Sequence, residues 1–283
     1  IMDNVADVTM TGETAANFFG TSVSSAGDVN GDGYSDVIVG ANGYSTFTGR
    51  AYIYFGGASM NNAVDVIMTG GATNNGFGIS VSDAGDVNGD GYSDVIVGAE
   101  LYSSSTGRAY IYYGGSTMNN IADVTMTGPA ADSKFGNSVS KAGDVNGDGY
   151  SDVIVGAVNY STATGRAYLF LGGISMNNGS DVIFTGESTG DQFGYSVSDA
   201  GDVNGDGYSD IIIGARGYLS STGRAYIFYG GLLTDIYPDV IITGEITISS
   251  LGASVSSAGD LNADGYSDVI VGADIYFIHT GKA

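Results

Sequence analysis

An all-β fold is predicted from a repeat that runs through the whole chain and from the short segments inside each repeat. The motif Asp-x-Asn-x-Asp starts at residues 28, 86, 144, 202 and 260, always 58 residues apart. Each period holds four short strand-like segments and shows no helical spacing of apolar side chains. A four-stranded sheet cannot bury both faces alone, so neighbouring repeats must stack. Stacked four-stranded antiparallel sheets are the blades of a β-propeller, which is favoured over a parallel solenoid. We expect a single propeller domain over residues 1–283.

The first repeat illustrates the expected strands. Residues 21–26 are small and alternating, as in a tightly packed inner strand, and residues 37–41 form an apolar run typical of a buried strand. Residues 49–56 are rich in aromatic side chains and give the third strand, and residues 65–70 give the fourth. Residues 7–12 match this fourth strand and are expected to be a strand as well.

The segment 28–36 is the turn of the hairpin between the first two strands, and its composition predicts a cation site. Side-chain oxygens stand at alternate positions, a Gly follows the third, and a further carboxylate closes the loop. A short loop that curls around one point directs alternate residues inward. Oxygen ligands without His or Cys suit Ca²⁺, and the backbone carbonyl of Tyr34 is the expected ligand between Asp32 and Asp36.

The same pattern occurs five times, which argues against a simple polar turn, although Asn-Gly and Asp-Gly favour turns by themselves. We expect about five Ca²⁺ ions, one in each repeat, that act as structural pins and not in catalysis. Ala263 replaces a Gly in the fifth loop, whose ligands are intact. The predicted ligands are Asp28, Asn30, Asp32, Tyr34 and Asp36; Asp86, Asn88, Asp90, Tyr92 and Asp94; Asp144, Asn146, Asp148, Tyr150 and Asp152; Asp202, Asn204, Asp206, Tyr208 and Asp210; and Asp260, Asn262, Asp264, Tyr266 and Asp268.

Composition narrows the possible partners. The formal net charge of −23 argues against nucleic acid and anionic membranes, and five divalent cations would offset part of it. There is no Cys, and no apolar run approaches the roughly 20 residues that span a bilayer. Weak modular calcium sites suit the millimolar Ca²⁺ outside cells, so we expect an extracellular or cell-surface location. The chain opens on Ile1, as expected of a mature or trimmed product.

Two dipeptides flank every acidic loop and carry a family resemblance. Phe19-Gly20 precedes the first loop and Gly40-Ala41 follows it. The counterparts are Phe77-Gly78 with Gly98-Ala99, Phe135-Gly136 with Gly156-Ala157, Phe193-Gly194 with Gly214-Ala215, and Leu251-Gly252 with Gly272-Ala273. This pattern resembles the FG-GAP repeat of the integrin α-subunit propeller over essentially the whole chain. The resemblance implies metal loops that stabilise the face away from the ligand.

Two departures from that family concern the loops and the blade count. The Pro that often follows Gly-Ala is replaced by Asn42, Glu100, Val158, Arg216 and Asp274. Integrin propellers have seven blades, whereas five repeats are present here. A five-bladed ring is favoured over part of a seven-bladed one, with the N-terminal strand completing the last blade. The third strand of that blade would otherwise come from unobserved residues or from another chain.

Recognition is expected on the loops opposite the acidic hairpins, because these loops vary while the strands between them hardly change. The variable loops are residues 42–48, 100–106, 158–164 and 216–222, together with 13–18, 72–76, 129–134 and 187–192. Drift in unconstrained loops is the alternative. The recurring candidates for ligand contact are Tyr44, Tyr102, Tyr160 and Tyr218, which could equally pack against a neighbouring blade. The recurring cations are expected to form structural ion pairs: Arg50, Arg108, Arg166, Arg224 and Lys282.

The sequence gives no support for catalysis. His279 is the only His and has no counterpart in the other repeats, and most of the carboxylates are committed to the acidic loops. The expected function is non-catalytic adhesion to an extracellular protein or glycan. The alternatives are a structural subunit of an extracellular filament, in which the partner is a copy of the same chain, and an accessory domain of a secreted hydrolase.

Overall fold

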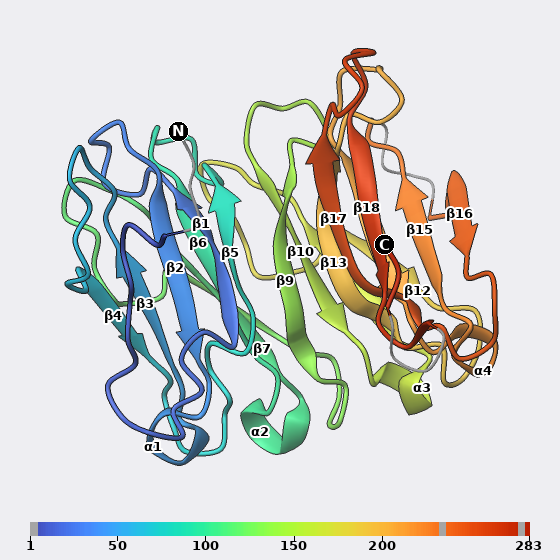
Figure 1. Ribbon diagram of the computed structural model, residues 1–283, viewed down its shortest axis with the longest axis horizontal. Helices are drawn as coiled ribbons and strands as arrows, with labels where there is room; N and C mark the ends of the chain where they lie inside the picture. Colours follow the sequence, from blue (N-terminus) through green and yellow to red (C-terminus); the bar gives the residue numbers. More distant parts are fainter. Residues whose placement is uncertain (1–4, 232–235, 277–280) are drawn as a thin grey trace.

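The computed structural model describes residues 5–231, 236–276 and 281–283. It contains five antiparallel sheets that follow one another in chain order, and each sheet is one blade (Figure 1). Blade 1 consists of β1 (Ser22–Gly27), β2 (Asp36–Ala41), β3 (Arg50–Tyr54) and β4 (Val66–Thr69). Blade 2 consists of β5 (Val81–Gly85), β6 (Asp94–Ala99), β7 (Arg108–Tyr112) and β8 (Val124–Thr127). Blade 3 consists of β9 (Phe135–Gly143), β10 (Asp152–Ala157), β11 (Arg166–Phe170) and β12 (Val182–Thr185).

Blades 4 and 5 complete the array. Blade 4 consists of β13 (Phe193–Gly201), β14 (Asp210–Ala215), β15 (Arg224–Phe228) and β16 (Val240–Thr243). In the described residues blade 5 contains β17 (Leu251–Gly259) and β18 (Asp268–Ala273). A bridge between Ala273 and Lys282 continues this sheet at the position where the third strand begins in other blades. The predicted β-propeller architecture, with its four-stranded antiparallel blades, is confirmed.

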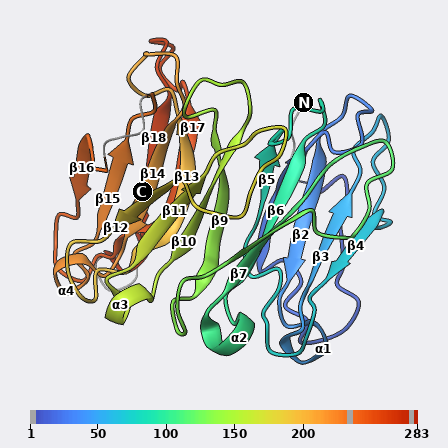
Figure 2. The same ribbon diagram turned by 180° about the vertical axis from the view of Figure 1, so that it is seen from behind.

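The first strands of successive blades contact one another, so they form the inner wall of the array (Figure 2). Inside each blade the neighbouring strands are antiparallel, as in the pairing of Val39 with Val23 on one side and with Tyr52 on the other. A one-turn helical segment separates the second and third strands of blades 1 to 4. These segments are α1 (Tyr44–Phe47), α2 (Tyr102–Ser105), α3 (Tyr160–Ala163) and α4 (Tyr218–Ser221). They were not expected from the sequence.

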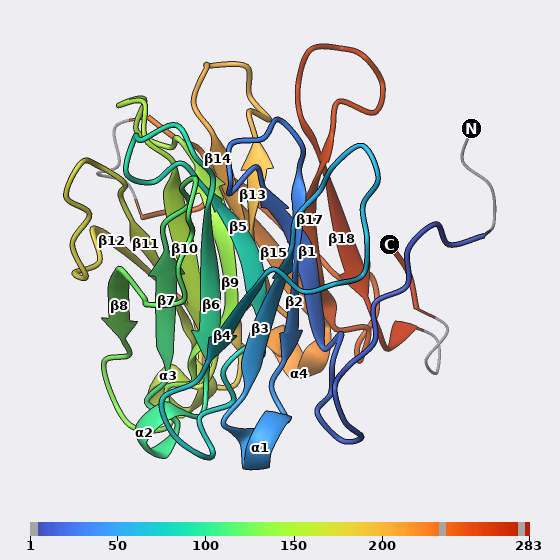
Figure 3. The ribbon, with the colours of Figure 1, turned by 90° about the vertical axis from the view of Figure 1, so that its left-hand side faces the viewer.

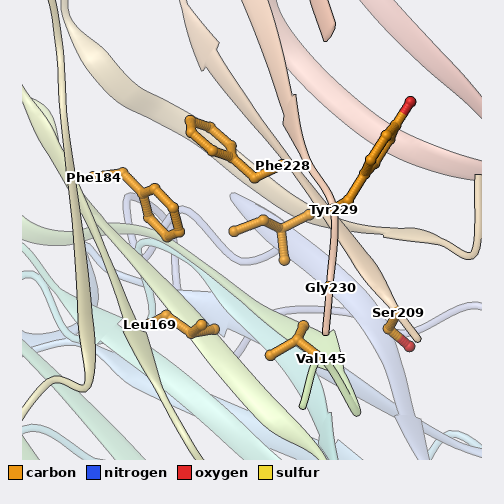
Figure 4. Close-up of a pocket in the computed structure, with 8 residues that line it drawn as sticks. Val145, Leu169, Phe184, Ser209, Phe228, Tyr229 and Gly230 are labelled. Atoms are coloured by element: carbon orange, nitrogen blue, oxygen red, sulfur yellow. The ribbon is translucent and has the colours of Figure 1, made fainter. Parts of the chain in front are cut away.

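The hydrophobic core is divided among the interfaces between blades. Figure 4 shows part of the interface between blades 3 and 4, where Phe184 of β12 faces Phe228 of β15 with ring centroids 4.4 Å apart. Leu169 and Val145 pack below them. The space left between these side chains is a cavity of about 10 Å³, the size of a single water molecule at most. This cavity is a packing gap in an apolar interface and not a ligand site.

Glycines allow the blades to approach closely. A Cβ on Gly98, the first residue of the second Gly-Ala pair, would lie 2.0 Å from the carbonyl oxygen of Gly136 in the next blade. Gly136 belongs to the third Phe-Gly pair, and equivalent contacts of 2.1 Å occur at the other three interfaces. The two dipeptides of the repeat therefore meet each other across every interface in the structure.

The array curves so that blades 1 and 5, blue and red, lie on the same side of the molecule (Figure 3). It is open within the described residues. Val23 is 65% exposed, whereas its counterpart Val81 is 4% exposed because blade 1 covers it. Ile270 of β18 is 49% exposed, whereas its counterpart Ile212 is fully buried by blade 5. The outer face of the last blade is thus open around Ile270, whereas on the first blade only the inner edge around Val23 is exposed, because Met10 and Phe19 cover Val39 and Tyr52.

Residues 7–12 do not form a strand, contrary to the expectation from their alternating pattern. Met10 packs on the outer face of blade 1, and the side chain of Asn62 approaches the carbonyl oxygen of Thr9. The equivalent side chain, Asn120, donates a hydrogen bond to Ile67 of β4. The segment therefore occupies the place of a fourth strand but has no third strand beside it to complete the ladder. The expected pairing of this segment with the last blade is not formed in the described residues.

Candidate metal centres and the variable-loop face

The acidic loops, defined as residues 28–36, 86–94, 144–152, 202–210 and 260–268, connect the first and second strands of every blade, as predicted. A bulge at the end of β1 redirects the chain into the first loop. Gly31 and Gly33 then adopt φ values of +76° and +88°, which glycine tolerates without steric cost. The Asp and Asn side chains of the loop can therefore turn back on their own backbone.

In the first loop, three polar side chains lie over the same short stretch of backbone. Asp28 accepts hydrogen bonds at Oδ1 from the N–H groups of Gly31 and Asp32, at 2.7 and 3.1 Å. Its Oδ2 accepts from Gly33 at 2.8 Å. The N–H of Asp32 also donates to Asn30 Oδ1 at 2.9 Å, so oxygens of two predicted ligands share one donor. The second, third and fourth loops repeat this pattern.

The carboxylate that closes each of the first four loops is buried. Asp36 is 1% exposed, and its two oxygens accept hydrogen bonds from Val29 at 2.9 Å and from Gly56 at 2.7 Å. The side chain therefore ties the loop to the end of the third strand. The equivalent residues of blades 2 to 4 are fully buried and make the same two kinds of bond: Asp94, Asp152 and Asp210.

The acidic loops bring several carboxylates close together, and this clustering of negative charge affects their pKa values. The pKa of Asp94 is raised to about 7, chiefly by burial and to a smaller extent by the negative charges of Asp90 and Asp86, against the lowering effect of the backbone N–H groups. The pKa of Asp152 is raised to about 7 and that of Asp210 to about 6 for the same reasons. Throughout the described ranges, none of the loop carboxylates forms an ion pair with Lys or Arg.

The donor set fits a hard cation, because every side chain at the predicted ligand positions offers oxygen. In the part of the chain that the structure describes, however, no three carboxylate, imidazole or thiol groups are gathered as a metal cluster. The loop oxygens are held by backbone N–H groups instead. Metal binding by the predicted residues therefore stays a prediction at this point.

The fifth loop differs from the other four. Ala263 has a φ of +60°, a conformation that costs a residue with a Cβ roughly 1 kcal/mol. The hydrogen bond that Gly31 donates to Asp28 has no counterpart at Ala263 in the described structure. Leu261 is 76% exposed, whereas its counterpart Val87 is fully buried. The fifth loop is therefore strained and less well packed.

Each of the first four acidic loops also contacts the loop of the following blade. The carbonyl oxygens of Asp28 and Val29 accept hydrogen bonds from Ser93 at 3.1 Å and from Gly115 at 2.8 Å, both in blade 2. A Cβ at Gly31 would lie 2.5 Å from the ring of Tyr92. The order of one loop thus depends on the position of the next, which the sequence pattern did not reveal.

The two sets of variable loops meet on the face opposite the acidic loops, as predicted, where α1 to α4 lie together at the lower edge of Figure 1. Gly43 donates a hydrogen bond to Asn17 at 3.1 Å, and Asn74 donates to Thr46 at 3.1 Å, so the loops support one another. Thr46 has a φ of +57°, and its neighbours on both sides are also left-handed. The same left-handed turn recurs in blades 2 to 4. We call this surface the variable-loop face.

The recurring tyrosines of this face are paired with the recurring cations. The Arg50 guanidinium lies 3.7 Å from the ring centroid of Tyr44, and the three equivalent pairs are 3.7 to 3.8 Å apart. Glu13 accepts from Arg50 at 2.7 Å, and equivalent ion pairs join Arg224 to Glu187 and Lys282 to Glu245. Each tyrosine is half-buried and has one ring face covered within its own chain. Ligand contact by these tyrosines stays a prediction.

Other expectations concern catalysis and membranes. His279 lies outside the described residues. In the described ranges no helix is both long and apolar enough to cross a bilayer.

Comparison with known proteins gives matches in every repeat. The family model of the FG-GAP repeat matches residues 19–54, 193–228 and 251–282, and that of the FG-GAP-like repeat matches residues 86–155. The matched ranges contain all five acidic loops and most of the dipeptides beside them, but not Phe77-Gly78 or Gly156-Ala157.

Curated proteins with similar sequences include integrin α-subunits. Integrin alpha-5 of Xenopus laevis is 32% identical over 165 residues, which cover 53% of this chain and 16% of the relative. Integrin alpha-6 of Gallus gallus is 33% identical, with coverage of 55% and 15%. Integrin alpha-PS3 of Drosophila melanogaster is 34% identical, with coverage of 52% and 14%. The match therefore spans about one-seventh of the length of these relatives.

Proposed function

This chain belongs to the FG-GAP repeat family, and we propose that it is a calcium-stabilised, non-catalytic binding module that acts outside the cell or at its surface. The variable-loop face recognises a protein or a glycan. The similarity to integrin α-subunits supports a role in adhesion. Nucleic acids and membrane insertion are excluded from the proposal by the net charge of −23 and by the lack of a long apolar segment.

The observation that carries this proposal is the division of the molecule into a constant end and a variable end. The acidic loops repeat the same hydrogen bonds in blades 1 to 4. At the other end, loops of different sequence stand on the same strands and support one another. A rigid scaffold with variable loops at one end is the usual arrangement of a recognition surface.

Calcium belongs to the constant end. The Asp and Asn side chains of each acidic loop would hold the ion, together with the carbonyl of the loop tyrosine, and the ion would neutralise the clustered carboxylates. The first four loops contact the next blade through hydrogen bonds such as that from Ser93 to Asp28. A bound ion would thus stabilise the interface between two blades as well as its own hairpin.

A binding screen with loop replacements tests the proposal. The protein in millimolar Ca²⁺ is immobilised and exposed to a panel of extracellular matrix proteins and glycans. Replacement of loop 158–164 by the sequence of loop 42–48 should weaken capture of any ligand found, because the side chains presented to the ligand change. The fold should be kept, since the donor loop already fits the same scaffold. The native chain, immobilised in the same way, serves as the control. A ligand that is captured equally by all loop variants would contradict recognition through this face.

A second function, self-assembly, is favoured by exposed apolar side chains on the first and last blades. Val23 on blade 1 and Ile270 on blade 5 occupy positions that are buried between blades elsewhere in the molecule. A second copy could place its first blade on the last blade of another. Light scattering in millimolar Ca²⁺ separates the two functions, since regular polymers would favour the structural role and compact monomers the adhesion role.

A further inference from the structure

A cavity of about 460 Å³ opens where the loops of four blades meet beside the inner strands. Three residue positions of the repeat contribute all of its lining residues except Asn159: the residue before Phe-Gly, the residue after Phe-Gly, and the residue after Gly-Ala. We call this cavity the inner-strand pocket. The members used in the argument are Glu100, Lys134, Asn137, Gln192, Tyr195 and Arg216.

Sequence variation is concentrated at these three positions. Before Phe-Gly the five repeats carry Phe, Gly, Lys, Gln and Ser; after it they carry Thr, Ile, Asn, Tyr and Ala; after Gly-Ala they carry Asn, Glu, Val, Arg and Asp. No residue type recurs at any of the three positions. The glycines between them are the same in every repeat. Maximal variation therefore lies next to the invariant contact between blades, where the backbone position is fixed.

Positive charge is also concentrated here. The chain has eight basic residues, and five of them occupy the repeated position at the start of the third strand. Two of the other three, Lys134 and Arg216, line the inner-strand pocket. In a chain with a net charge of −23, these two cations create a local site for an anion.

The polar groups of the pocket are held in place by hydrogen bonds within blade 4 and between blades 3 and 4. The Arg216 guanidinium lies 3.8 Å from the ring centroid of Tyr195 and donates to its hydroxyl at 2.8 Å and to Gln192 Oε1 at 3.0 Å. These bonds use two of the five N–H donors of the guanidinium. Asn137 in turn donates to the carbonyl oxygens of Gly194 and Tyr195 at 3.1 and 3.0 Å. Arg216 is thus oriented without a carboxylate partner among the described residues.

Lys134 is held less firmly. Its Nζ lies 3.6 Å from Glu100 Oε2, which is longer than a hydrogen bond, and both side chains are partly exposed. An ion pair of this kind contributes little and is readily exchanged for another anion. Glu100 therefore behaves as an internal competitor for any carboxylate that enters the pocket.

We propose that the inner-strand pocket binds the carboxylate of an acidic sugar, with Arg216 and Lys134 as the charged contacts. A cavity of this volume holds a whole sugar ring and is larger than one Asp or Glu side chain requires. Its neutral members, Gln192, Asn159 and Tyr195, can pair with ring hydroxyl groups. This inference rests on the proposed binding function of the variable-loop face and names the ligand class for its centre.

Calorimetric titration in millimolar Ca²⁺ provides the test. The probes are the methyl glycosides of glucuronic, galacturonic and N-acetylneuraminic acid, and the matched neutral probes are their methyl esters. We expect at least one acid to bind and its ester to bind roughly 10- to 100-fold more weakly, since a charged hydrogen bond is lost. Binding should also weaken with added salt.

Variants assign the effect to the pocket. R216Q and K134Q should each weaken binding of the acid, roughly tenfold or more for R216Q. E100Q should strengthen it several-fold because the competing carboxylate is removed, a gain that damage to the fold would not produce. R108Q is the matched control, because Arg108 stacks on Tyr102 on the same face but does not line the pocket.

Four results would overturn the proposal. The first three are equal binding of acid and ester, equal binding by the native chain and R216Q, and no binding of any acid in the panel. Binding of an aspartate-rich peptide in place of the sugars would also overturn it. A different ligand captured in the general screen would leave the proposed function intact, so the two failures are distinguishable.

Discussion

Gly98 and Gly272 occupy the same place in two identical strand sequences but face different surroundings. Both are the fifth residue of the segment Asp-Val-Ile-Val-Gly-Ala, in β6 and β18. A Cβ on Gly98 would lie 2.0 Å from the carbonyl oxygen of Gly136 and 3.0 Å from its carbonyl carbon. A Cβ on Gly272 would meet only the hydroxyl of Ser254, at 2.5 Å, which can rotate away. Neither glycine has a positive φ, so Ala fits both backbones.

The substitution Gly98→Ala should therefore destabilise the protein through the interface between blades 2 and 3. The clash involves backbone on both sides, so no rotamer change relieves it, and the blades must move apart. Overpacking of this kind costs about 1–3 kcal/mol. For a chain of this size, each kcal/mol lowers the melting temperature by roughly 2–4 °C. We expect Gly98→Ala to lower the melting temperature by about 5 °C in total, from the overpacking cost and that conversion.

Gly272→Ala is the matched control, and its effect should be neutral or stabilising by up to about 1 kcal/mol, because Ala restricts the unfolded chain. The assay is thermal unfolding followed by circular dichroism at fixed millimolar Ca²⁺. An unchanged melt for Gly98→Ala would refute the close contact between the two dipeptides. An equal loss for both variants would show that another blade covers β18 in solution.

Four further predictions concern the acidic loops. Removal of calcium by a chelator should lower the melting temperature substantially, since a single site filled at 100 times its Kd contributes about 2.7 kcal/mol; an unchanged melt would exclude calcium from the stability of the fold. The chelated protein should be more stable at pH 5 than at pH 8. The pKa values of Asp94 and Asp152 are raised to about 7 in the folded chain. The folded chain therefore binds more protons than the unfolded chain between roughly pH 4 and 7, and its stability falls as the pH rises through that range. Melting curves across this range check the sign, which should reverse when calcium is bound. Asp90→Ala should remove one equivalent of bound calcium and leave the other sites. Ala263→Gly should tighten calcium binding at the fifth site, because Gly adopts the left-handed conformation without strain. Calcium titration measures both effects.

Local sequence patterns were sufficient to place the strands and the acidic loops. The small alternating residues before Asp28 and the apolar run after Asp36 correspond to β1 and β2. The two dipeptides marked the repeat, but their contact with each other was not predictable from one repeat, because Gly98 and Gly136 belong to successive blades. Residues 7–12 show the limit of alternation as a signal: the pattern permits a strand, but a strand also requires a partner.

The inner-strand pocket was hidden from the sequence for a related reason. Lys134, Glu100 and Arg216 come from three blades and are brought together only by the packing of the array. The signal that could have found them is the total variation at three positions beside invariant glycines. The left-handed turns around Thr46 were also unforeseen, because Ser, Thr and Ala rarely adopt this conformation outside constrained loops.

The two ends of a repeat have different physical tasks, and this explains why one end can vary. At the loop end, blades are joined by backbone contact between glycines such as Gly98 and Gly136, which depends on no side chain. At the acidic end, they are joined by hydrogen bonds between successive loops, such as that from Ser93 to Asp28. Because neither contact uses the residues that follow Phe-Gly or Gly-Ala, those residues can change from repeat to repeat without loosening the array. Stability and recognition are therefore separated along the strands, and a ligand site can differ between blades that are otherwise the same.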